Sequence, residues 1–170
     1  MKRVVVTGLG LVTPLGCGST NVWNALLAGK CGIQKLEGTE YNKIPSRVAA
    51  RVPDFNAIDY LAPSEIRTMS RASIYAVVAA TEAIKDAGIG SGEINKKTGV
   101  AIGMGMSDLD YIVETAEILK EKGPSKISPY FVPRILTNMA SGIISIKHNF
   151  EGPNHSVSTA CATGAHSIGN

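Results

Sequence analysis

The amino-acid sequence predicts an α/β fold with a mainly parallel sheet and helices on the faces of that sheet. Short apolar runs alternate with longer segments in which apolar residues recur at helical spacing. Hairpin signals are few, and this alternation of strands and helices is typical of parallel sheets. The 170 residues contain no internal repeat, low-complexity tract or linker, so we expect one domain over residues 1–170.

The elements expected in the first half follow from apolar runs and from capping or breaking residues. They are a buried strand at Val4–Val6, a helix at Ser19–Ala28 with Trp23 as a core residue, a strand at Arg47–Val52, a short helix from Pro63 and a long helix at Ser70–Ala87. Gly29 and Gly88 each follow a predicted helix, at the position where glycine commonly ends one.

The second half is expected to begin with a central strand at Gly99–Gly105, which runs into a glycine-rich turn. The elements that follow are a helix from Ser107 or Asp108 to about Lys122, a helix at roughly Arg134–Lys147 and a short strand at Asn154–Ser158. The residues from Ala160 to His166 are good helix formers and predict a further helix.

Gly8 and Gly10 form a partial G-x-G pattern after the first predicted strand, which invites a dinucleotide-binding interpretation. Thr13 stands at the third glycine position, however, and Pro14 follows it. We therefore expect these two glycines to allow a tight turn and close backbone packing, in preference to nucleotide binding.

Asp108 and Asp110 form a pair of carboxylates of the kind that metal binding or acid–base chemistry would use. They stand where a helix is expected to begin, and the helix dipole favours acidic residues near an amino-terminus. We therefore interpret them as residues of a helix start.

The composition narrows the range of partners and compartments. The net charge is +3 and no basic run is longer than two residues, so nucleic-acid binding is not expected. No stretch approaches the length of a membrane span, and the apolar run after Arg3 is interrupted too early for a signal peptide. Cys17, Cys31 and Cys161 form no C-x-x-C pair and are odd in number, which favours a reducing compartment and argues against secretion.

The stretch from Asn154 to His166 is the strongest candidate for a catalytic site. It alternates like a short strand up to Ser158 and then becomes a run of small residues around Cys161. A cysteine at a strand-to-helix junction lies among unpaired backbone N–H groups, which together with the helix dipole favour the thiolate. The small neighbours leave room for a substrate carbonyl, so Cys161 is a candidate nucleophile. The alternative is a buried core thiol.

The histidines near Cys161 are poor candidates for its general base. His155 lies six residues earlier on an extended segment, about 20 Å away at ~3.3 Å per residue. His166 lies five residues later in the expected helix and would face away from Cys161. The sequence does not place His148 relative to the site. The group that activates the thiol, besides the helix terminus, is therefore expected outside the adjoining residues.

Five blocks of the sequence resemble the β-ketoacyl-acyl-carrier-protein synthases, the condensing enzymes of fatty-acid synthesis. These blocks are Val4–Gly10, Gly103–Met106, Ser128–Pro133, Gly152–His155 and the nucleophile motif Ser158–Gly164. They follow the family's order and spacing over all 170 residues. The Asn138–Gly142 block and the Pro-Asn-His block look nearest to the mitochondrial form of the elongating, type II-like members.

This resemblance implies a thiolase-like fold, of which the chain would supply the N-terminal half, one of two pseudo-repeated βαβαβαββ halves. The family's polypeptide is much longer, and its second half supplies two histidines, a lysine and a phenylalanine whose backbone N–H helps form the oxyanion hole. We therefore expect residues 1–170 to be the N-terminal synthase domain, truncated just after the nucleophile, and condensation to need the missing half.

The resemblance also implies the roles of individual residues. Cys161 would accept an acyl group from carrier-protein phosphopantetheine, with its backbone N–H as one oxyanion donor, before a decarboxylative condensation with malonyl-carrier protein. Met106 matches the position that closes the acyl-chain tunnel, and Tyr130 and Phe131 match its aromatic segment. The alternative for these three side chains is ordinary core packing.

Arg67 and Lys126 match basic positions near the family's entrance, where the carrier protein docks. A solvated surface is the alternative interpretation of each charge. The other implied partner is a second copy of the full-length protein in a homodimer, and the resemblance implies no cofactor and no metal.

The resemblance favours the mitochondrial matrix as the location, with the bacterial cytoplasm as the alternative. Two functions stay open for the chain itself. It is either the nucleophile-bearing part of an acyltransferase or a non-catalytic truncated form that associates with a full-length condensing enzyme. The second function rests on the expectation that half of such a core exposes the face that packs on the other half.

Overall fold

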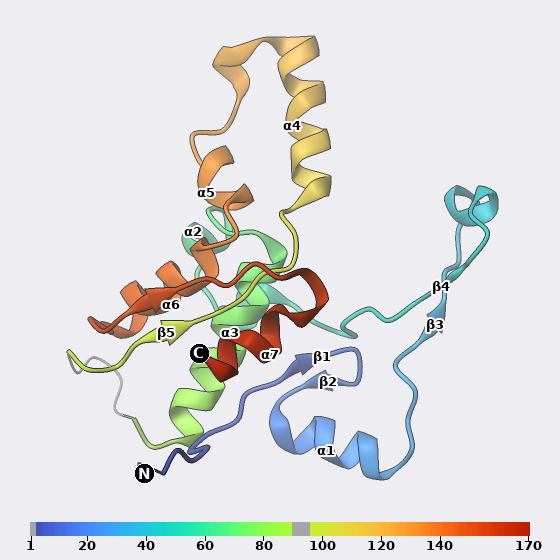
Figure 1. Ribbon diagram of the computed structural model, residues 1–170. Helices are drawn as coiled ribbons and strands as arrows, with labels where there is room; N and C mark the ends of the chain where they lie inside the picture. The colour runs from blue at the N-terminus through green and yellow to red at the C-terminus, as the bar shows by residue number, and fades with distance from the viewer. Residues whose placement is uncertain (1–2, 90–95) are drawn as a thin grey trace. The chain divides into compact units, whose positions relative to one another are not determined.

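The structure of the chain is a computed structural model that describes residues 3–89 and 96–170 (Figure 1). The chain divides into two compact units. The first comprises residues 1–56 and 78–89, and the second comprises residues 57–77 and 90–170. The long helix α3, Arg71–Asp86, confirms the helix predicted at Ser70–Ala87. Its first residues belong to the second unit and its last residues to the first.

In its described residues, the first unit contains two short antiparallel ladders, an α-helix and a 3-10 helix, besides the last residues of α3. Its elements are β1 (Val12–Thr13), β2 (Gly16–Cys17), α1 (Ser19–Leu27), β3 (Gln34–Lys35), the 3-10 helix η1 (Thr39–Lys43) and β4 (Val48–Ala49). Strand β1 pairs with β2 and β3 pairs with β4, in both cases antiparallel. The helix predicted at Ser19–Ala28 is confirmed, and the strand predicted at Arg47–Val52 is present in shorter form.

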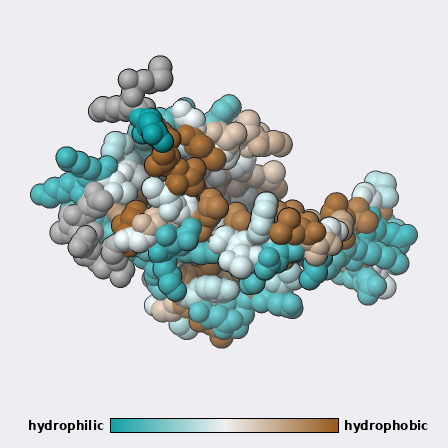
Figure 2. All heavy atoms as spheres, turned by 90° about the horizontal axis from the view of Figure 1, so that it is seen from below, coloured by the Kyte–Doolittle hydropathy of each residue, from teal (hydrophilic) through white to brown (hydrophobic). Residues whose placement is uncertain are grey.

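Two predictions for the first unit are wrong. Val4–Val6 is exposed and is not a strand, because no strand among the described residues pairs with it. Trp23 is 58% exposed, because α1 buries a different side, which carries Val22 and Ala25. Large hydrophobic side chains are accordingly visible on the surface of the chain (Figure 2).

Gly8 and Gly10 lie directly against the part of α3 that belongs to the first unit. A Cβ atom on Gly8 would overlap the carbonyl oxygen of Ala83, and one on Gly10 would overlap the carbonyl oxygen of Ala79. The predicted role of these glycines in close backbone packing is therefore confirmed.

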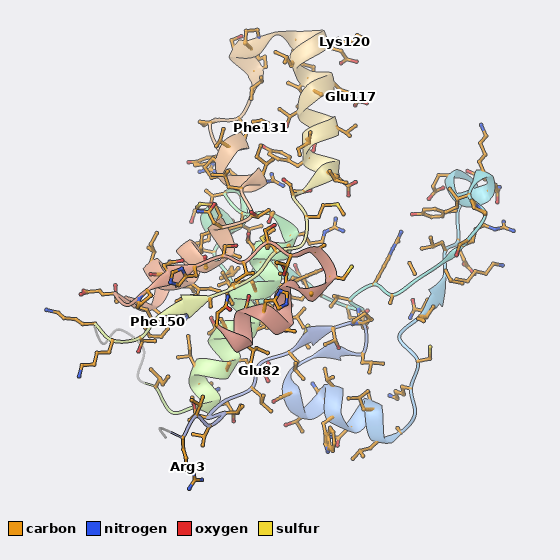
Figure 3. All side chains as sticks on the ribbon, in the orientation of Figure 1. Arg3, Glu82, Glu117, Lys120, Phe131 and Phe150 are labelled. Carbon is orange, nitrogen blue, oxygen red and sulfur yellow. The ribbon has the colours of Figure 1, made fainter. Side chains whose placement is uncertain are left out.

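Two carboxylates of α3 bind the backbone of the segment that contains these glycines. Glu82 accepts the N–H of Leu11 at 2.9 Å and the N–H of Ser19 at 2.6 Å (Figure 3). Asp86 accepts the N–H of Leu9 at 2.9 Å. Charged acceptors make strong hydrogen bonds with backbone donors, so these contacts fix the segment along the helix.

The second unit is built around one parallel ladder and the helix α6. Its elements, besides the first residues of α3, are η2 (Ala57–Asp59), α2 (Pro63–Ile66), β5 (Val100–Ala101), α4 (Leu109–Lys122), η3 (Pro124–Lys126), α5 (Phe131–Ile135), α6 (Met139–His148), β6 (Asn154–His155), η4 (Ala160–Ala162) and α7 (Thr163–Gly169).

Strands β5 and β6 pair in parallel, with Val100 opposite Asn154 and Ala101 opposite His155. Of the ladders that the described residues form, this is the parallel one. Helix α6 packs against both of its strands (Figure 1). The core of this unit consists of buried apolar side chains from α3, β5, α6 and the segments beside them, namely Leu61, Met69, Ile74, Val77, Val100, Met104, Ala140, Ile144 and Phe150.

Helix α4 begins where the sequence predicts it to begin. The Asp108 carboxylate precedes the helix and accepts the N–H of Tyr111 at 3.3 Å. Its other oxygen lies 3.8 Å from the Arg134 guanidinium, which also stacks over the Tyr111 ring at 3.6 Å from the ring centroid. The interpretation of Asp108 as a residue of a helix start is therefore confirmed.

The single helix expected at Arg134–Lys147 is wrong, because the structure has two helices there, α5 and α6. Leu136 is extended, with a ψ of 127°, and ends α5. The carbonyl oxygen of Ile135 accepts a hydrogen bond from Ser107 Oγ, at 2.5 Å. A side chain from another segment thus satisfies a carbonyl at the point where the helix stops.

His148 is a buried residue at the end of α6, and its ring stacks on Phe150 with centroids 5.7 Å apart. Burial lowers the pKa of His148, and the charge of Lys147 lowers it further. Lys147 also donates to Glu65 Oε1 at 2.7 Å, and this bond is the main cause of a lowered pKa of Glu65. Both shifts make the stability of the fold depend on pH.

We predict that stability falls in two steps as the pH falls. Below about pH 6.5 the unfolded state binds a proton at His148 more readily than the native state, so the free energy of unfolding decreases. Below pH 4.5, the ordinary pKa of Glu65, the contribution of that carboxylate to the free energy of unfolding is lost as well. Urea denaturation across this range should show that His148→Gln flattens the first step and leaves the second. An unchanged first step in this variant would contradict the role of His148.

Candidate active site

Cys161 lies in η4, between the strand β6 and the helix α7 of the second unit. This is the strand–turn–helix arrangement that the sequence predicts. The cysteine is exposed, so the alternative of a buried core thiol is wrong. Its role as a nucleophile stays a prediction at this point.

The residue before Cys161 has an unusual backbone conformation. Ala160 has a φ of +50°, in the left-handed region that residues with a side chain rarely adopt. A residue in this conformation costs on the order of 1–2 kcal/mol and keeps it only where neighbouring interactions impose it. The conformation around Cys161 therefore depends on contacts from the rest of the unit.

Thr163 supplies the first of these contacts. Its side chain is buried, and its Oγ1 accepts the N–H of Thr159 at 2.5 Å and donates to the carbonyl oxygen of Val157 at 3.2 Å. The N–H of Ala162 also donates to the carbonyl oxygen of Thr159, at 3.2 Å. One buried hydroxyl thus joins the two sides of the turn that contains Cys161.

The glycine-rich segment after β5 supplies the second contact. A Cβ atom on Gly103 would overlap Cγ2 of Thr163 and lie 2.9 Å from Oγ of Ser167. A Cβ atom on Gly105 would lie 3.2 Å from the carbonyl oxygen of Ala160. The turn therefore rests on backbone that carries no side chains, which explains why this block has glycines at both positions.

The predicted acyl-tunnel residues lie at the beginnings of α4 and α5 in the same unit. Met106 is 63% exposed, so core packing does not account for it. Tyr130 and Phe131 are half-buried, and the Phe131 ring lies 6.0 Å from the Tyr111 ring of α4, tilted by 41° (Figure 3). The structure thus places the predicted aromatic segment against α4.

The predicted docking residues lie near this segment. The Arg67 guanidinium lies over the Tyr130 ring, 5.6 Å from its centroid, and Lys126 is exposed at the end of η3. The structure therefore brings Arg67 together with the aromatic segment. Within residues 3–89 and 96–170, no recorded hydrogen bond, ion pair or ring contact joins these residues to Cys161.

One group of side chains close to Cys161 in the sequence was not predicted. Thr159 Oγ1 lies 2.7 Å from His166 Nδ1 and 3.2 Å from Thr163 Oγ1. The signal in the sequence was a pair of threonines four residues apart, a spacing that allows contact across one turn. We call Thr159, Thr163 and His166 the threonine–histidine clasp.

The described part of the chain holds no group of three or more His, Cys, Asp or Glu side chains that could bind a metal ion. None of its helices has the length and apolar character that crossing a membrane requires.

The model of the family "Beta-ketoacyl synthase, N-terminal domain" matches residues 1–170, so the chain belongs to the β-ketoacyl synthase family. A crystal structure of a β-ketoacyl synthase from Burkholderia phymatum superimposes with a TM-score of 0.79 at 28% identity, covering 99% of this chain and 42% of that one. The predicted thiolase-like fold class is thereby confirmed.

Curated relatives come from bacteria and from mitochondria. The chain is 45% identical to 3-oxoacyl-[acyl-carrier-protein] synthase 2 of Rhizobium meliloti, over 100% of this chain and 42% of the relative. It is 44% identical to the mitochondrial 3-oxoacyl-[acyl-carrier-protein] synthase of Arabidopsis thaliana, over 99% of this chain and 41% of the relative. The chain therefore spans about two-fifths of these relatives, and the mitochondrial resemblance is shared with bacterial forms.

We predict that Gly103→Ala disrupts the turn around Cys161. The added methyl group would overlap Thr163, so the change should cost about 1–3 kcal/mol of stability and slow alkylation of Cys161. Chemical denaturation measures the first effect, and iodoacetamide labelling followed by peptide mass spectrometry measures the second at Cys161 alone.

Gly142→Ala is the matched control for this substitution. Gly142 lies within α6, and its added Cβ would have no atom within 4 Å. We expect this variant to keep the wild-type labelling rate and to gain slightly in stability, because alanine favours helix. Equal labelling rates in the two variants would contradict the account of the turn.

Proposed function

We propose that these 170 residues carry the nucleophile of a 3-oxoacyl-[acyl-carrier-protein] synthase, an acyltransferase of fatty-acid biosynthesis. The observation that carries the proposal is the exposed Cys161, held after a left-handed Ala160 in a chain of this family. The curated relatives are named for this activity. Because the chain spans about two-fifths of them, we assign the activity to the complete synthase that contains it.

In the first half-reaction, the Cys161 thiolate attacks the thioester carbon of an acyl-carrier protein. The phosphopantetheine thiolate leaves and takes up a proton, and the acyl group becomes a thioester on Cys161. The backbone N–H of Cys161 donates to the oxyanion that forms on the way, a contribution of about 3 kcal/mol for a donor of this kind. Exposure of the side chain gives the carrier-bound thioester access to the sulfur.

In the second half-reaction, malonyl-carrier protein loses CO₂ and the resulting carbanion attacks the Cys161 thioester. A carbon–carbon bond forms, 3-oxoacyl-carrier protein leaves, and the thiolate is regenerated. The family's histidine and lysine motifs for this step do not occur in these 170 residues, so the rest of the complete synthase supplies them. The reaction involves no net change of redox state at the protein, and we propose no cofactor.

The acyl chain is assigned to the region of Met106, Tyr130 and Phe131. Met106 is an exposed and flexible apolar side chain, and Tyr130 and Phe131 are half-buried aromatic residues, so all three are suited to contact with a hydrocarbon chain. The carrier protein is assigned to Arg67 and Lys126, because an acidic partner would be attracted to exposed cations near that region.

We predict that removing both charges weakens the carrier-protein contact. Arg67→Gln together with Lys126→Gln in the complete synthase should raise KM for acyl-carrier protein about tenfold at low salt, with a smaller effect at high salt. Steady-state kinetics at two ionic strengths measure this change. Lys43→Gln, in the first unit, is the control and should leave KM unchanged. Wild-type KM in the double variant at low salt would remove both residues from the docking site.

A second function is favoured by one observation, the number of exposed hydrophobic side chains. Val4 is 96% exposed and Ile168 is 90% exposed, although both are residues that normally avoid water. On this alternative the chain is a non-catalytic form that associates with a full-length condensing enzyme.

For the complete synthase we also propose a homodimer, and a location in the mitochondrial matrix or else in the bacterial cytoplasm.

The proposed activity predicts the effect of removing the thiol. The complete synthase should convert acyl- and malonyl-carrier protein into 3-oxoacyl-carrier protein and CO₂, and Cys161→Ser should lower the rate roughly 10³-fold or more. Cys31→Ser is the matched control, because Cys31 is also exposed but lies in the first unit. Substantial condensation by Cys161→Ser would contradict the proposal.

A further inference from the structure

The threonine–histidine clasp surrounds Cys161 in the sequence and has no role in the reaction described above. Thr159 stands two residues before the cysteine, Thr163 two residues after it and His166 five residues after it. Three contacts join their side chains and backbone into one network, with lengths from 2.5 to 3.2 Å. Thr163 is buried, whereas Thr159 and His166 are exposed.

The protons of this network can be assigned by counting donors and acceptors. A threonine hydroxyl has one proton to donate and two lone pairs that accept. The Thr163 proton goes to the carbonyl oxygen of Val157, so Thr163 Oγ1 accepts both from the N–H of Thr159 and from its hydroxyl. The proton of the Thr159 hydroxyl is then donated to Thr163. In the contact between Thr159 Oγ1 and His166, the donor must therefore be Nδ1–H of His166.

We propose that His166 is a positioning residue of the nucleophile turn, acting as an Nδ1–H donor to Thr159. This inference rests on the proposed function of Cys161 as the nucleophile. Nδ1–H of His166 donates to the Thr159 hydroxyl, and this hydroxyl donates to Thr163 Oγ1. Thr163 in turn joins the two sides of the turn. Nε2 of His166 carries no proton when the ring is neutral, and protonation there leaves the Nδ1–H bond in place.

The need for such a network follows from the backbone. The left-handed Ala160 lies between Thr159 and Cys161 and keeps its conformation only if its neighbours are held. Without the His166 donor, Thr159 can turn its hydroxyl away from Thr163, and the peptide before Cys161 gains freedom. The thiol and its backbone N–H would then spend less time in the reactive arrangement, which lowers rate constants without removing any group that touches the substrate.

Four variants of the complete synthase test this inference. His166→Asn can keep a donor near the position of Nδ1, whereas His166→Gln places its amide one carbon further out. Gln has the higher helix propensity of the two, so a slower His166→Gln enzyme cannot be explained by a weaker α7. Thr159→Ser keeps the hydroxyl and Thr159→Val removes it at nearly the same volume.

Two readouts are taken for each variant. One is the alkylation rate of Cys161 with iodoacetamide, followed by peptide mass spectrometry. The other is the rate constant and KM of acyl transfer from acyl-carrier protein. We expect His166→Gln and Thr159→Val each to lower both rates about tenfold with KM unchanged, and His166→Asn and Thr159→Ser to stay within about threefold of wild type.

The double variant His166→Gln, Thr159→Val should be no slower than Thr159→Val alone, since His166 acts through Thr159. Wild-type rates in His166→Gln would overturn the inference, and so would equal losses in His166→Asn and His166→Gln, or additive losses in the double variant. Wild-type protein that is alkylated at Cys161 but transfers no acyl group would overturn the proposed function instead. The alkylation rates would then still decide the role of the clasp.

Discussion

The second unit depends on the close approach of two pieces of backbone, the glycine-rich segment after β5 and the turn that contains Cys161. Gly103 and Gly105 leave no side chain between them and the turn, and Thr163 fills the space with a buried hydroxyl. The parallel ladder of β5 and β6 brings these segments together, since each runs on from the same end of its strand. The backbone around Cys161 is therefore held by this close approach and by the hydrogen bonds of Thr163.

In the first unit, too, glycines allow two backbone segments to lie in direct contact. Gly8 and Gly10 let the chain lie directly on α3, and the carboxylates of Glu82 and Asp86 bind its backbone N–H groups. In both units glycine allows backbone to approach backbone, and polar side chains then fix the contact. In both units the glycine blocks of the sequence mark the places where two backbone segments lie in direct contact.

Local signals predicted the helices and the Cys161 turn, because capping residues and apolar spacing act within a few residues. Asp108 marked the start of α4, and glycines marked the ends of α1 and α3. The failures were non-local. Val4–Val6 has strand character but no partner among the described residues, and the bond from Ser107 at the end of α5 joins segments 28 residues apart. The threonine–histidine clasp was missed because helical spacing describes where His166 lies relative to Cys161, not which hydroxyl it contacts.

The most direct test of the account is the mass of the protein after incubation with acyl-carrier protein in the absence of malonyl-carrier protein. We expect one added acyl group on the complete synthase, located at Cys161 by peptide mapping and absent from Cys161→Ser. The same measurement on the 170-residue chain shows whether the turn alone supports acyl transfer. An acyl group on another residue, or none on the complete synthase, would contradict the assignment of Cys161 as the nucleophile.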